Sequence, residues 1–367
     1  MSLRRKTSAN TQYSELVSIL DANFEGKLNL ARTKFIAMFI VSLCKVQSVT
    51  FEKLAIAFDS HSKTSSSLRR IQRFIADFYF DSNIVAKLIF NLLPKKDDLI
   101  LSIDRTNWKF GVVNINIFML GIVYKGVAFP LIFKMLDKRG NSNSQERIDL
   151  INTYIKLFGK NTIQCIVADR EFVGGKWIEY LNFENIKYYI RIRNNFKVYL
   201  PHKSKSIKVS WLFNCFQKHQ FVHYPKIIQI NGQLCYLSGS KLGIKNGKQE
   251  YFIIISFNKP ELGKQKYKTR WQIEMCFKAF KSSGFDLEKT HLNDLVRIQK
   301  LILLTMIAFV WCYKVGIYLN SIEPIIIKTH GRKAISIFKY GLNFIASNFL
   351  NNNFQSNINI YDFLSCT

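Results

Sequence analysis

The chain has 367 residues, with 53 Lys or Arg against 25 Asp or Glu, so its formal net charge at pH 7 is +28. Its 48% hydrophobic content, with only 6 prolines and 17 glycines, excludes a disordered, collagenous or linker-like protein and suffices for two or three globular domains. Because the positive charge runs along the whole chain, nucleic acid is the expected partner and an anionic membrane surface the weaker alternative.

The sequence shows no convincing targeting or membrane-spanning segment. Arg4, Arg5 and Lys6 near the start are followed by polar residues instead of an apolar run. The longest uncharged apolar run, residues 301–313, is shorter than the roughly 20 residues of a membrane helix and predicts a buried core helix. The 7 cysteines include no C-x-x-C pair, which suits a reducing compartment. We therefore expect a cytoplasmic protein.

The first part of the chain has a helical pattern. Apolar residues recur at three and four positions up to Pro94, which predicts an all-helical domain over residues 1–94. Residues 49–58 and 68–78 are expected helices on either side of a Ser-rich turn at 61–67, loosely resembling a helix-turn-helix. Arg69, Arg70 and Arg73 on the second helix are either an ordinary solvated face or DNA contacts, and the net charge favours DNA contacts.

After Pro94 the pattern changes to strands. Strands are predicted at 98–104, 116–124 and 127–134, the last two joined as an antiparallel pair by a Lys-Gly turn. A helix at 144–158, a strand at 162–168, a helix at 176–183 and a strand at 187–192 follow. The order βββαβαβ predicts an α/β fold with a mixed sheet and flanking helices.

The rest of the chain divides into a β-rich and a helical part. Between about residues 194 and 266, short runs at 226–230, 234–238 and 251–257 predict a β-rich insertion. Within it, Cys215, His219 and His223 have the spacing of three zinc ligands on a helix face, but the aromatic residues around them favour core packing. Helical pattern resumes at Tyr267 and continues through most of 295–319 and 334–347.

The strongest local signal is the segment YKTRWQIEMCFKAFK. On one helix, Tyr267, Arg270, Glu274 and Lys281 would share a face within about 60°. A salt-bridged surface helix is the simple alternative, but the remaining residues are apolar nearly all round, so the charged strip must face a cleft. A metal on the carboxylate and phosphates on the two cations would satisfy every member.

Two more carboxylates follow apolar strands. Asp104 and Asp169 end predicted strands, and each is followed at once by an arginine. Alone, each is more often a strand-terminal cap or turn former. Together with Glu274 they would need a cation such as Mg²⁺ or Mn²⁺, and three carboxylates can hold the two metals of a phosphoryl-transfer site.

The motif Y-(2)-R-(3)-E-(6)-K resembles the signature of the DDE transposases of the insertion sequence 4 family. The resemblance implies that Asp104, Asp169 and Glu274 are the catalytic, metal-binding residues of a ribonuclease H-like core over residues 95–292, with a β-rich insertion at about 194–266. Tyr267, Arg270 and Lys281 would hold phosphates. Glu171 departs from many members, which have a small residue there, but Asp169 directly follows the strand and is the preferred ligand.

The resemblance also implies cut-and-paste transposition. The protein would bind the terminal inverted repeats of its element, nick double-stranded DNA and use the freed 3′-hydroxyl on target DNA, with a two-metal Mg²⁺ or Mn²⁺ site. Trp211 is a candidate for stacking on a flipped base, unless it is core. The helical region 293–367, with its apolar surface, is expected to form a homodimer that pairs two ends.

Three other functions remain open from the residues. A ribonuclease H-like nuclease or junction resolvase would use the same carboxylates without strand transfer. A transposase-derived DNA-binding protein would have lost catalysis, although all three acids are present here. An RNA-binding protein would expose aromatic residues such as Tyr224 or Tyr236 and would need no metal.

Overall fold

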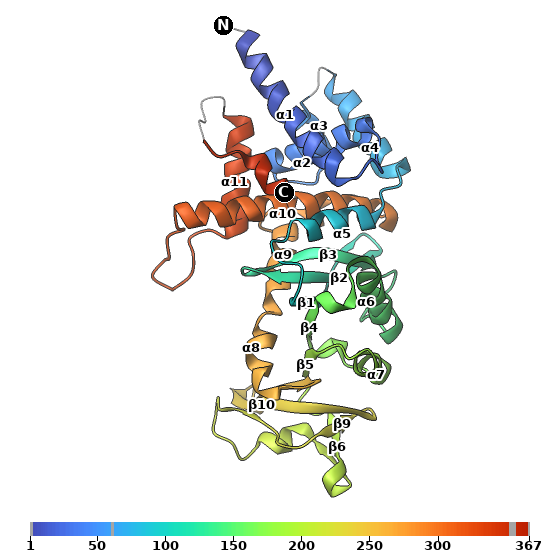
Figure 1. Cartoon of the computed structure of the whole chain (residues 1–367), viewed down its shortest axis with the longest axis vertical. Helices are drawn as coiled ribbons and strands as arrows, with labels where there is room; N and C mark the ends of the chain where they lie inside the picture. The colour runs from blue at the N-terminus through green and yellow to red at the C-terminus, as the bar shows by residue number, and fades with distance from the viewer. Residues whose placement is uncertain (1–2, 60–61, 352–356, 366–367) are drawn as a thin grey trace. The chain divides into compact units, whose positions relative to one another are not determined.

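A computed structural model describes residues 3–59, 62–351 and 357–365 (Figure 1). By their contacts the residues fall into two compact units. Unit 1 consists of Met1–Pro94, Trp108–Ile115 and Phe277–Thr367, and unit 2 of Lys95–Asn107 and Asn116–Cys276. Helices from both ends of the sequence therefore belong to one unit, and most of the sheet belongs to the other.

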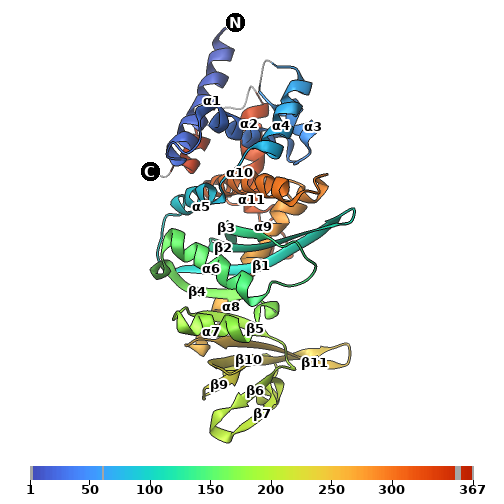
Figure 2. The ribbon, with the colours of Figure 1, turned by 90° about the vertical axis from the view of Figure 1, so that its right-hand side faces the viewer.

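Unit 1 is helical. Its helices are α1 (Leu3–Asn23), α2 (Leu30–Val46), α3 (Phe51–Ala57), α4 (Thr64–Asp77), α5 (Ser82–Asn91), α10 (Leu295–Ile322) and α11 (Ile337–Leu350). Helices α2, α10 and α11 contact one another (Figures 1 and 2). The predicted helices at 49–58 and 68–78 are confirmed as α3 and α4.

The predicted turn at 61–67 is wrong for most of its length. Helix α4 begins at Thr64, so the serines at 65–67 form its first turn. Hydroxyl side chains suit this position because the first N–H groups of a helix have no intrahelical partner. His61, the first residue of that predicted turn, lies outside the described residues.

Helix α10 is the central core element of unit 1. Among the described residues it is the one helix long and apolar enough to span a membrane, and 83% of its apolar window is buried within the chain. Helices α2 and α3 would pass the same test only as one segment bent by 104°. The buried core helix predicted at 301–313 is thus confirmed as part of α10.

Two glycines allow α10 and α11 to approach closely. A Cβ atom on Gly316 would lie 2.0 Å from the carbonyl oxygen of Ile337, and one on Gly341 would lie 1.9 Å from that of Cys312. Both distances are far below van der Waals contact, so any side chain would push the backbones apart. These glycines set the spacing of the helix pair.

Unit 2 is built on one mixed sheet. The strands are β1 (Leu99–Phe110), β2 (Val113–Tyr124), β3 (Val127–Met135), β4 (Ile163–Ala168), β5 (Tyr188–Ile192), β6 (Lys197–Leu200), β7 (Lys205–Lys208), β8 (Phe221–His223), β9 (Ile228–Ile230), β10 (Gln233–Lys245) and β11 (Lys248–Ser256). Their order is β3-β2-β1-β4-β5-β11-β10-β9-β6-β7, with β8 beside β10. Strand β4 runs parallel to both β1 and β5, and β2 and β3 are antiparallel.

Helices cover the sheet on both sides. Helices α6 (Ser144–Phe158) and α7 (Gly175–Phe183) lie on one side, and α8 (Gly263–Lys268) packs against β4, β5, β10 and β11 on the other (Figures 1 and 2). The predicted order βββαβαβ is confirmed. A mixed sheet with flanking helices fits the ribonuclease H-like core that the sequence predicts.

The β-rich insertion extends the core sheet. Its strands β6 to β11 fall within the predicted region, but β11 pairs antiparallel with β5, with Ile253 opposite Ile192. Alternating patterns along separate strands do not reveal such a pairing, because it joins segments far apart in sequence. The remaining short 3₁₀ helices are η1 (Lys160–Thr162), η2 (Arg170–Phe172), η3 (Pro201–Lys203), η4 (Val209–Phe213), η5 (Pro260–Leu262), η6 (Leu287–Lys289) and η7 (Ile360–Leu364).

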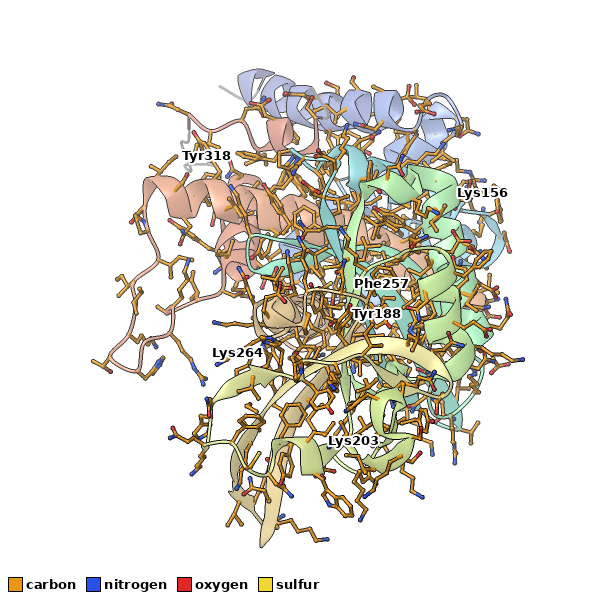
Figure 3. All side chains as sticks on the ribbon, turned by 60° about the horizontal axis from the view of Figure 1, so that its bottom comes forward. Lys156, Tyr188, Lys203, Phe257, Lys264 and Tyr318 are labelled. Atoms are coloured by element: carbon orange, nitrogen blue, oxygen red, sulfur yellow. The ribbon has the colours of Figure 1, made fainter. Side chains whose placement is uncertain are left out.

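Aromatic packing fixes the sheet in unit 2. The ring of Tyr188 in β5 is fully buried and meets Phe257, just after β11, edge to face at 6.3 Å (Figure 3). Edge-to-face pairs are favoured because the positive ring edge faces the negative ring surface. This contact joins the end of the insertion to the core strand beside β4.

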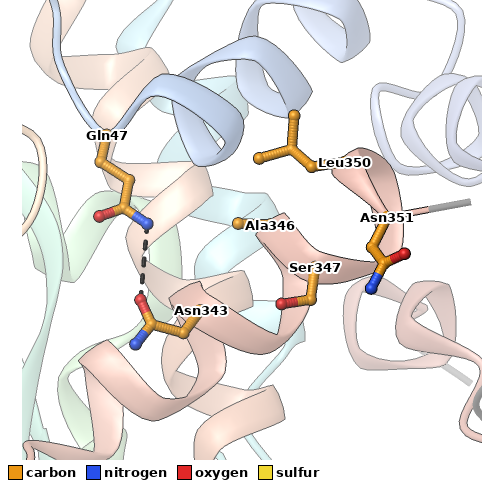
Figure 4. A pocket seen from close by; sticks show the side chains of 6 residues that line it. All are labelled: Gln47, Asn343, Ala346, Ser347, Leu350 and Asn351. Atoms are coloured by element: carbon orange, nitrogen blue, oxygen red, sulfur yellow. Dashed lines mark hydrogen bonds between the residues drawn. The ribbon is translucent and has the colours of Figure 1, made fainter. Parts of the chain in front are cut away.

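A separate pocket lies in unit 1, next to α11. The amide of Gln47, at the end of α2, donates a 3.5 Å hydrogen bond to Oδ1 of Asn343 there (Figure 4). The pocket is lined by Gln47, Asn343, Ala346, Ser347, Leu350 and Asn351. None of these residues belongs to the predicted site.

Candidate active site

Strand register brings the two predicted aspartates to adjacent positions. Parallel strands β1 and β4 pair through Ile103 opposite Ala168. Asp104 and Asp169 are the residues that follow this pair, so both lie at one edge of the buried part of the sheet. The prediction that Asp104 ends its strand is wrong, because β1 continues to Phe110, but the fully buried segment does end at Ile103.

The segment with the other four predicted residues is not one continuous helix. Helix α8 ends at Lys268 and α9 (Trp271–Lys281) begins three residues later. At the break, the N–H of Arg270 bonds the carbonyl of Tyr267 at 3.0 Å, a three-residue spacing. The Thr269 hydroxyl also bonds the Lys266 carbonyl at 2.7 Å, and such local bonds compete with α-helical ones. The single shared helix face is therefore wrong, and Arg270 lies at the break.

Arg270 joins two of the three acids. Its Nη1 donates to Oδ2 of Asp104 at 2.9 Å, and its Nη2 donates to Oε1 of Glu274 at 2.5 Å. The arginine is 7% exposed, so solvent screens these pairs little. The Ser102 hydroxyl, in β1, donates to the Arg270 carbonyl at 3.3 Å and fixes its backbone to the strand that carries Asp104.

Tyr267 joins the third acid to the core. Its hydroxyl donates to Oδ1 of Asp169 at 2.8 Å. Its ring lies in a buried cluster with Cys165 and Val167 from β4, Tyr189 from β5 and Ile254 from β11. A buried tyrosine hydroxyl generally finds a partner, and here that partner is a carboxylate of the predicted triad. Tyr267 thus orients Asp169 from a fixed position.

The two aspartates have opposite pKa shifts. Burial raises the pKa of Asp104 to about 7, against the lowering effect of the Arg105 backbone N–H and Arg270. Partial burial also raises the pKa of Asp169, but the N–H of Arg170, the Tyr267 hydroxyl and Arg270 together bring it below its ordinary value. Carboxyls with pKa values pushed apart are typical of sites that exchange protons or bind cations.

A network around Glu171 supports the end of β4. Both oxygens of Glu171 accept from the Arg105 guanidinium, from Nε at 3.4 Å and from Nη2 at 3.2 Å. Nη2 of buried Arg147 donates to the Glu171 carbonyl at 2.9 Å. No role for Arg105 or Arg147 was predicted from the sequence. The sequence does contain a signal for Arg105, because an arginine directly follows each of the two aspartates. It contains no signal that would distinguish Arg147 from the other residues of its amphipathic helix.

Lys281 makes its contacts in unit 1. Its Nζ pairs with Oε1 of Glu288 at 2.8 Å and lies 5.3 Å from the ring centroid of Trp108. These contacts involve residues outside the group around Arg270. Lys281 therefore has a carboxylate partner and an aromatic partner of its own.

The remaining predicted DNA-binding residues are exposed. Arg69, Arg70 and Arg73 are exposed along α4. Arg70 and Arg73 also line a groove with Arg32, whose guanidinium lies 4.6 Å from the centroid of Phe78. Trp211, in η4, is 58% exposed, so it is not a core residue.

The acids do not form a complete metal cluster. Within the part of the chain that the structure describes, no group of three His, Cys, Asp or Glu side chains is arranged to hold a metal ion. Cys215, His219 and His223 are therefore not arranged as a zinc site either. Asp104 and Glu274 nevertheless converge on one cationic group, the guanidinium of Arg270. Two converging carboxylates are hard oxygen donors and fit Mg²⁺ or Mn²⁺.

Comparison with known proteins gives a family. Residues 96–311 match the family described as transposase DDE domain. Comparison with the curated proteins finds no match. One similar solved structure is a chain of the cryo-EM structure of the piggyBac transposase synaptic complex with hairpin DNA, at 13% identity and a TM-score of 0.46, covering 96% of this chain and 82% of that one. Because the family match spans more than half of its residues, the chain belongs to the family of transposases with a DDE domain.

Proposed function

We propose that this protein binds the terminal inverted repeats of its own element and catalyses metal-dependent cleavage and strand transfer in cut-and-paste transposition. Within its family we assign it to the insertion sequence 4 group, on the spacing of Tyr267, Arg270, Glu274 and Lys281. The observation that carries the proposal is the contact of Arg270 with Asp104 and Glu274, beside Asp169 at the end of the adjacent strand.

Asp104, Asp169 and Glu274 are the proposed catalytic residues. They would hold Mg²⁺ or Mn²⁺ in a two-metal site, which when bound supplies activation of a water or hydroxyl and stabilisation of the leaving oxygen. Tyr267 holds Asp169 by its hydroxyl, and Arg105, next to Asp104 in the chain, holds the carboxylate of Glu171. These contacts keep the acids oriented toward the phosphodiester.

DNA contacts are proposed in three places. Arg270 would bind a phosphate beside the acids, and Lys281, the other cation of the signature, would bind a phosphate from unit 1. Exposed Arg69, Arg70 and Arg73 would make the helical segment 1–94 a DNA-binding region. Exposed Trp211 in the insertion would stack on an unpaired base.

Region 293–367 is proposed to form a homodimer that pairs two ends of the element in the cytoplasm. Most apolar side chains of α10 are buried within the chain and give no such surface. The end of α10 and the segment after it do, because Ile322, Ile326 and Ile327 are each at least 60% exposed.

The test is nicking of DNA that carries the flanking ends of the element, in Mg²⁺ or Mn²⁺, by the parent protein and by Glu274→Gln. The substitution keeps the shape of the side chain and removes its charge, so we expect a loss of at least about 100-fold in cleavage with DNA binding retained. Glu171→Gln is the matched control and should retain far more activity, because its carboxylate is bonded to Arg105.

The alternatives predict different outcomes. Cleavage without joining to target DNA would favour a ribonuclease H-like nuclease or resolvase. DNA binding with no cleavage by the parent protein in either metal would favour a transposase-derived DNA-binding protein. Equal cleavage by the parent protein and Glu274→Gln would remove Glu274 from the triad.

A further inference from the structure

The position of Arg270 supports an inference that rests on the proposed function. The guanidinium donates one hydrogen bond to Asp104 and one to Glu274, so both carboxylates share a single positive charge. We propose that Arg270 occupies the place between these two acids until a divalent metal binds, and that metal binding releases the guanidinium to a DNA phosphate. Arg270 would thus couple metal binding to DNA binding.

The guanidinium is incompletely bonded where it lies. Its Nε is buried and has no hydrogen-bond partner among the described residues. A buried donor without an acceptor is unfavourable, because it has lost its hydrogen bond to water and forms no hydrogen bond within the protein in its place. A phosphate presents several acceptor oxygens to a guanidinium fork, so transfer to DNA would allow all its donors to bond.

The exchange requires movement of the side chain alone. The backbone of Arg270 is held by the Ser102 hydroxyl at its carbonyl and by the Tyr267 carbonyl at its N–H. The guanidinium carbon lies 5.6 Å from the ring centroid of buried Tyr267 and 6.0 Å from that of Trp271. Trp271 is 59% exposed, so one neighbour of the guanidinium is open to solvent.

Electrostatic repulsion prevents a divalent metal and the Arg270 guanidinium from lying between Asp104 and Glu274 at the same time. A divalent cation between Asp104 and Glu274 would repel a guanidinium in the same place and would replace it as the counter-ion of both acids. A displaced arginine in a nearly buried position needs another anion. By linkage, each of the two ligands then raises the affinity for the other.

The first experiment measures Mn²⁺ binding to the DNA-free protein, with free Mn²⁺ followed by electron paramagnetic resonance. Arg270→Gln removes the competing cation, and we expect it to bind Mn²⁺ roughly tenfold more tightly than the parent protein. Arg270→Lys keeps the charge but lacks a fork that reaches both acids, so its affinity should be intermediate. It also serves as the folded variant if Arg270→Gln does not fold.

The control is Lys138→Gln, which removes the same charge from unit 2 at an ion pair with Glu146. It should leave Mn²⁺ affinity within about twofold, because it lies outside the group around Arg270. Equal or weaker Mn²⁺ binding by both Arg270 variants would overturn the proposal, since the arginine would then organise the acids for metal.

The second experiment measures DNA affinity in EDTA. Glu274→Gln removes one of the two carboxylate partners of Arg270 and is made in two backgrounds, the parent protein and the Arg270→Gln variant. It should raise DNA affinity more in the parent protein, where Arg270 is present, than in the variant that lacks it. The difference between the two backgrounds isolates the arginine from the general loss of a negative charge. An equal gain in both backgrounds would contradict the release of Arg270 to phosphate.

Failure of this inference is distinct from failure of the proposed function. If the parent protein binds Mn²⁺ through Glu274 and the Arg270 variants bind it no better, the function stands and the exchange is wrong. If neither the parent protein nor Arg270→Gln binds Mn²⁺, with or without DNA, the metal-dependent function fails and the exchange fails with it.

Discussion

At the residue scale, the hydroxyl of Tyr267 can be tested separately from its ring. Tyr267→Phe keeps the ring in the buried cluster and removes the hydrogen bond to Asp169. The loss of an oriented ligand should raise the metal concentration for half-maximal nicking by about 10-fold or more. It should also lower the free energy of unfolding by about 1 kcal/mol.

Tyr189→Phe is the matched control for that change. Tyr189 belongs to the same buried cluster, but its hydroxyl donates to the carbonyl of Lys259 and not to a carboxylate. It should change stability by a similar amount and leave the metal requirement unaltered. Equal metal dependence in both variants would show that Tyr267 does not orient Asp169.

The sequence indicates which residues to propose for the site, but it does not indicate their contacts. The acids and the signature are visible as residue types at fixed spacings. The bridge from Arg270 to Asp104 depends on how α8 and α9 meet β1, which spacing does not encode. The same applies to Arg147, whose bond to the Glu171 carbonyl is formed only in the fold.

At the element scale, the start of α6 predicts a dependence of stability on pH. Although partial burial raises the pKa of Glu146, hydrogen bonds from Lys138 Nζ and the Asn143 N–H lower it below its ordinary value. A carboxylate with a lowered native pKa stabilises the fold above its unfolded pKa, and this stabilisation is lost as the pH falls.

We therefore compare the parent protein with Glu146→Gln, which can still form the capping box with Asn143. The parent should be more stable by up to about 1 kcal/mol above pH 5, and the difference should vanish as the pH falls below about 4. Urea unfolding across this range measures it. Glu179→Gln, at an exposed position of α7, is the control for removal of one negative charge from a helix.

Elements were predictable where one local pattern decides them. The boundaries of α6 were predicted without error because a capping residue begins the helix and a glycine with positive φ ends it. The break before α9 was not predicted, because the apolar periodicity of the sequence continues through Thr269, and the interruption is visible only in the hydrogen bonds of Thr269 and Arg270. The pairing of β11 with β5 was not predicted either, because it joins segments that are far apart in the sequence.

At the scale of the whole molecule, the charge of +28 predicts a steep salt dependence of DNA binding. If Arg70 and Arg73 contact phosphates, Arg70→Gln with Arg73→Gln should reduce the slope of log K against log salt concentration by about 2. Titration of labelled DNA at several salt concentrations measures this slope.

Removal of two charges from a face for which no DNA contact is proposed gives the comparison. Lys156 and Lys160, at the end of α6 and in η1, are suitable, and Lys156 lies at the periphery in Figure 3. Their double replacement by Gln should change the slope by much less. The same change in both double variants would mean that the arginines of α4 act only through net charge.

The sequence predicts which segments of the chain are helical and which are β-rich, but not how these segments are grouped into compact units. Composition separates the helical ends from the β-rich middle. It does not indicate that helices before Pro94 and after Cys276 belong to one compact unit, because that grouping depends on contacts such as those of α2 with α10 and α11.

This partition has a consequence for synthesis on the ribosome. The N-terminal helices emerge first, but α10 and α11, which cover α2, are made only after the whole of unit 2. At roughly 5–20 residues per second, the apolar side chains of α2 wait on the order of 10 seconds or more for their partners. During that interval the nascent chain exposes the apolar face of α2, which favours aggregation. The yield of folded protein in cells should therefore depend on chaperones that bind nascent polypeptides.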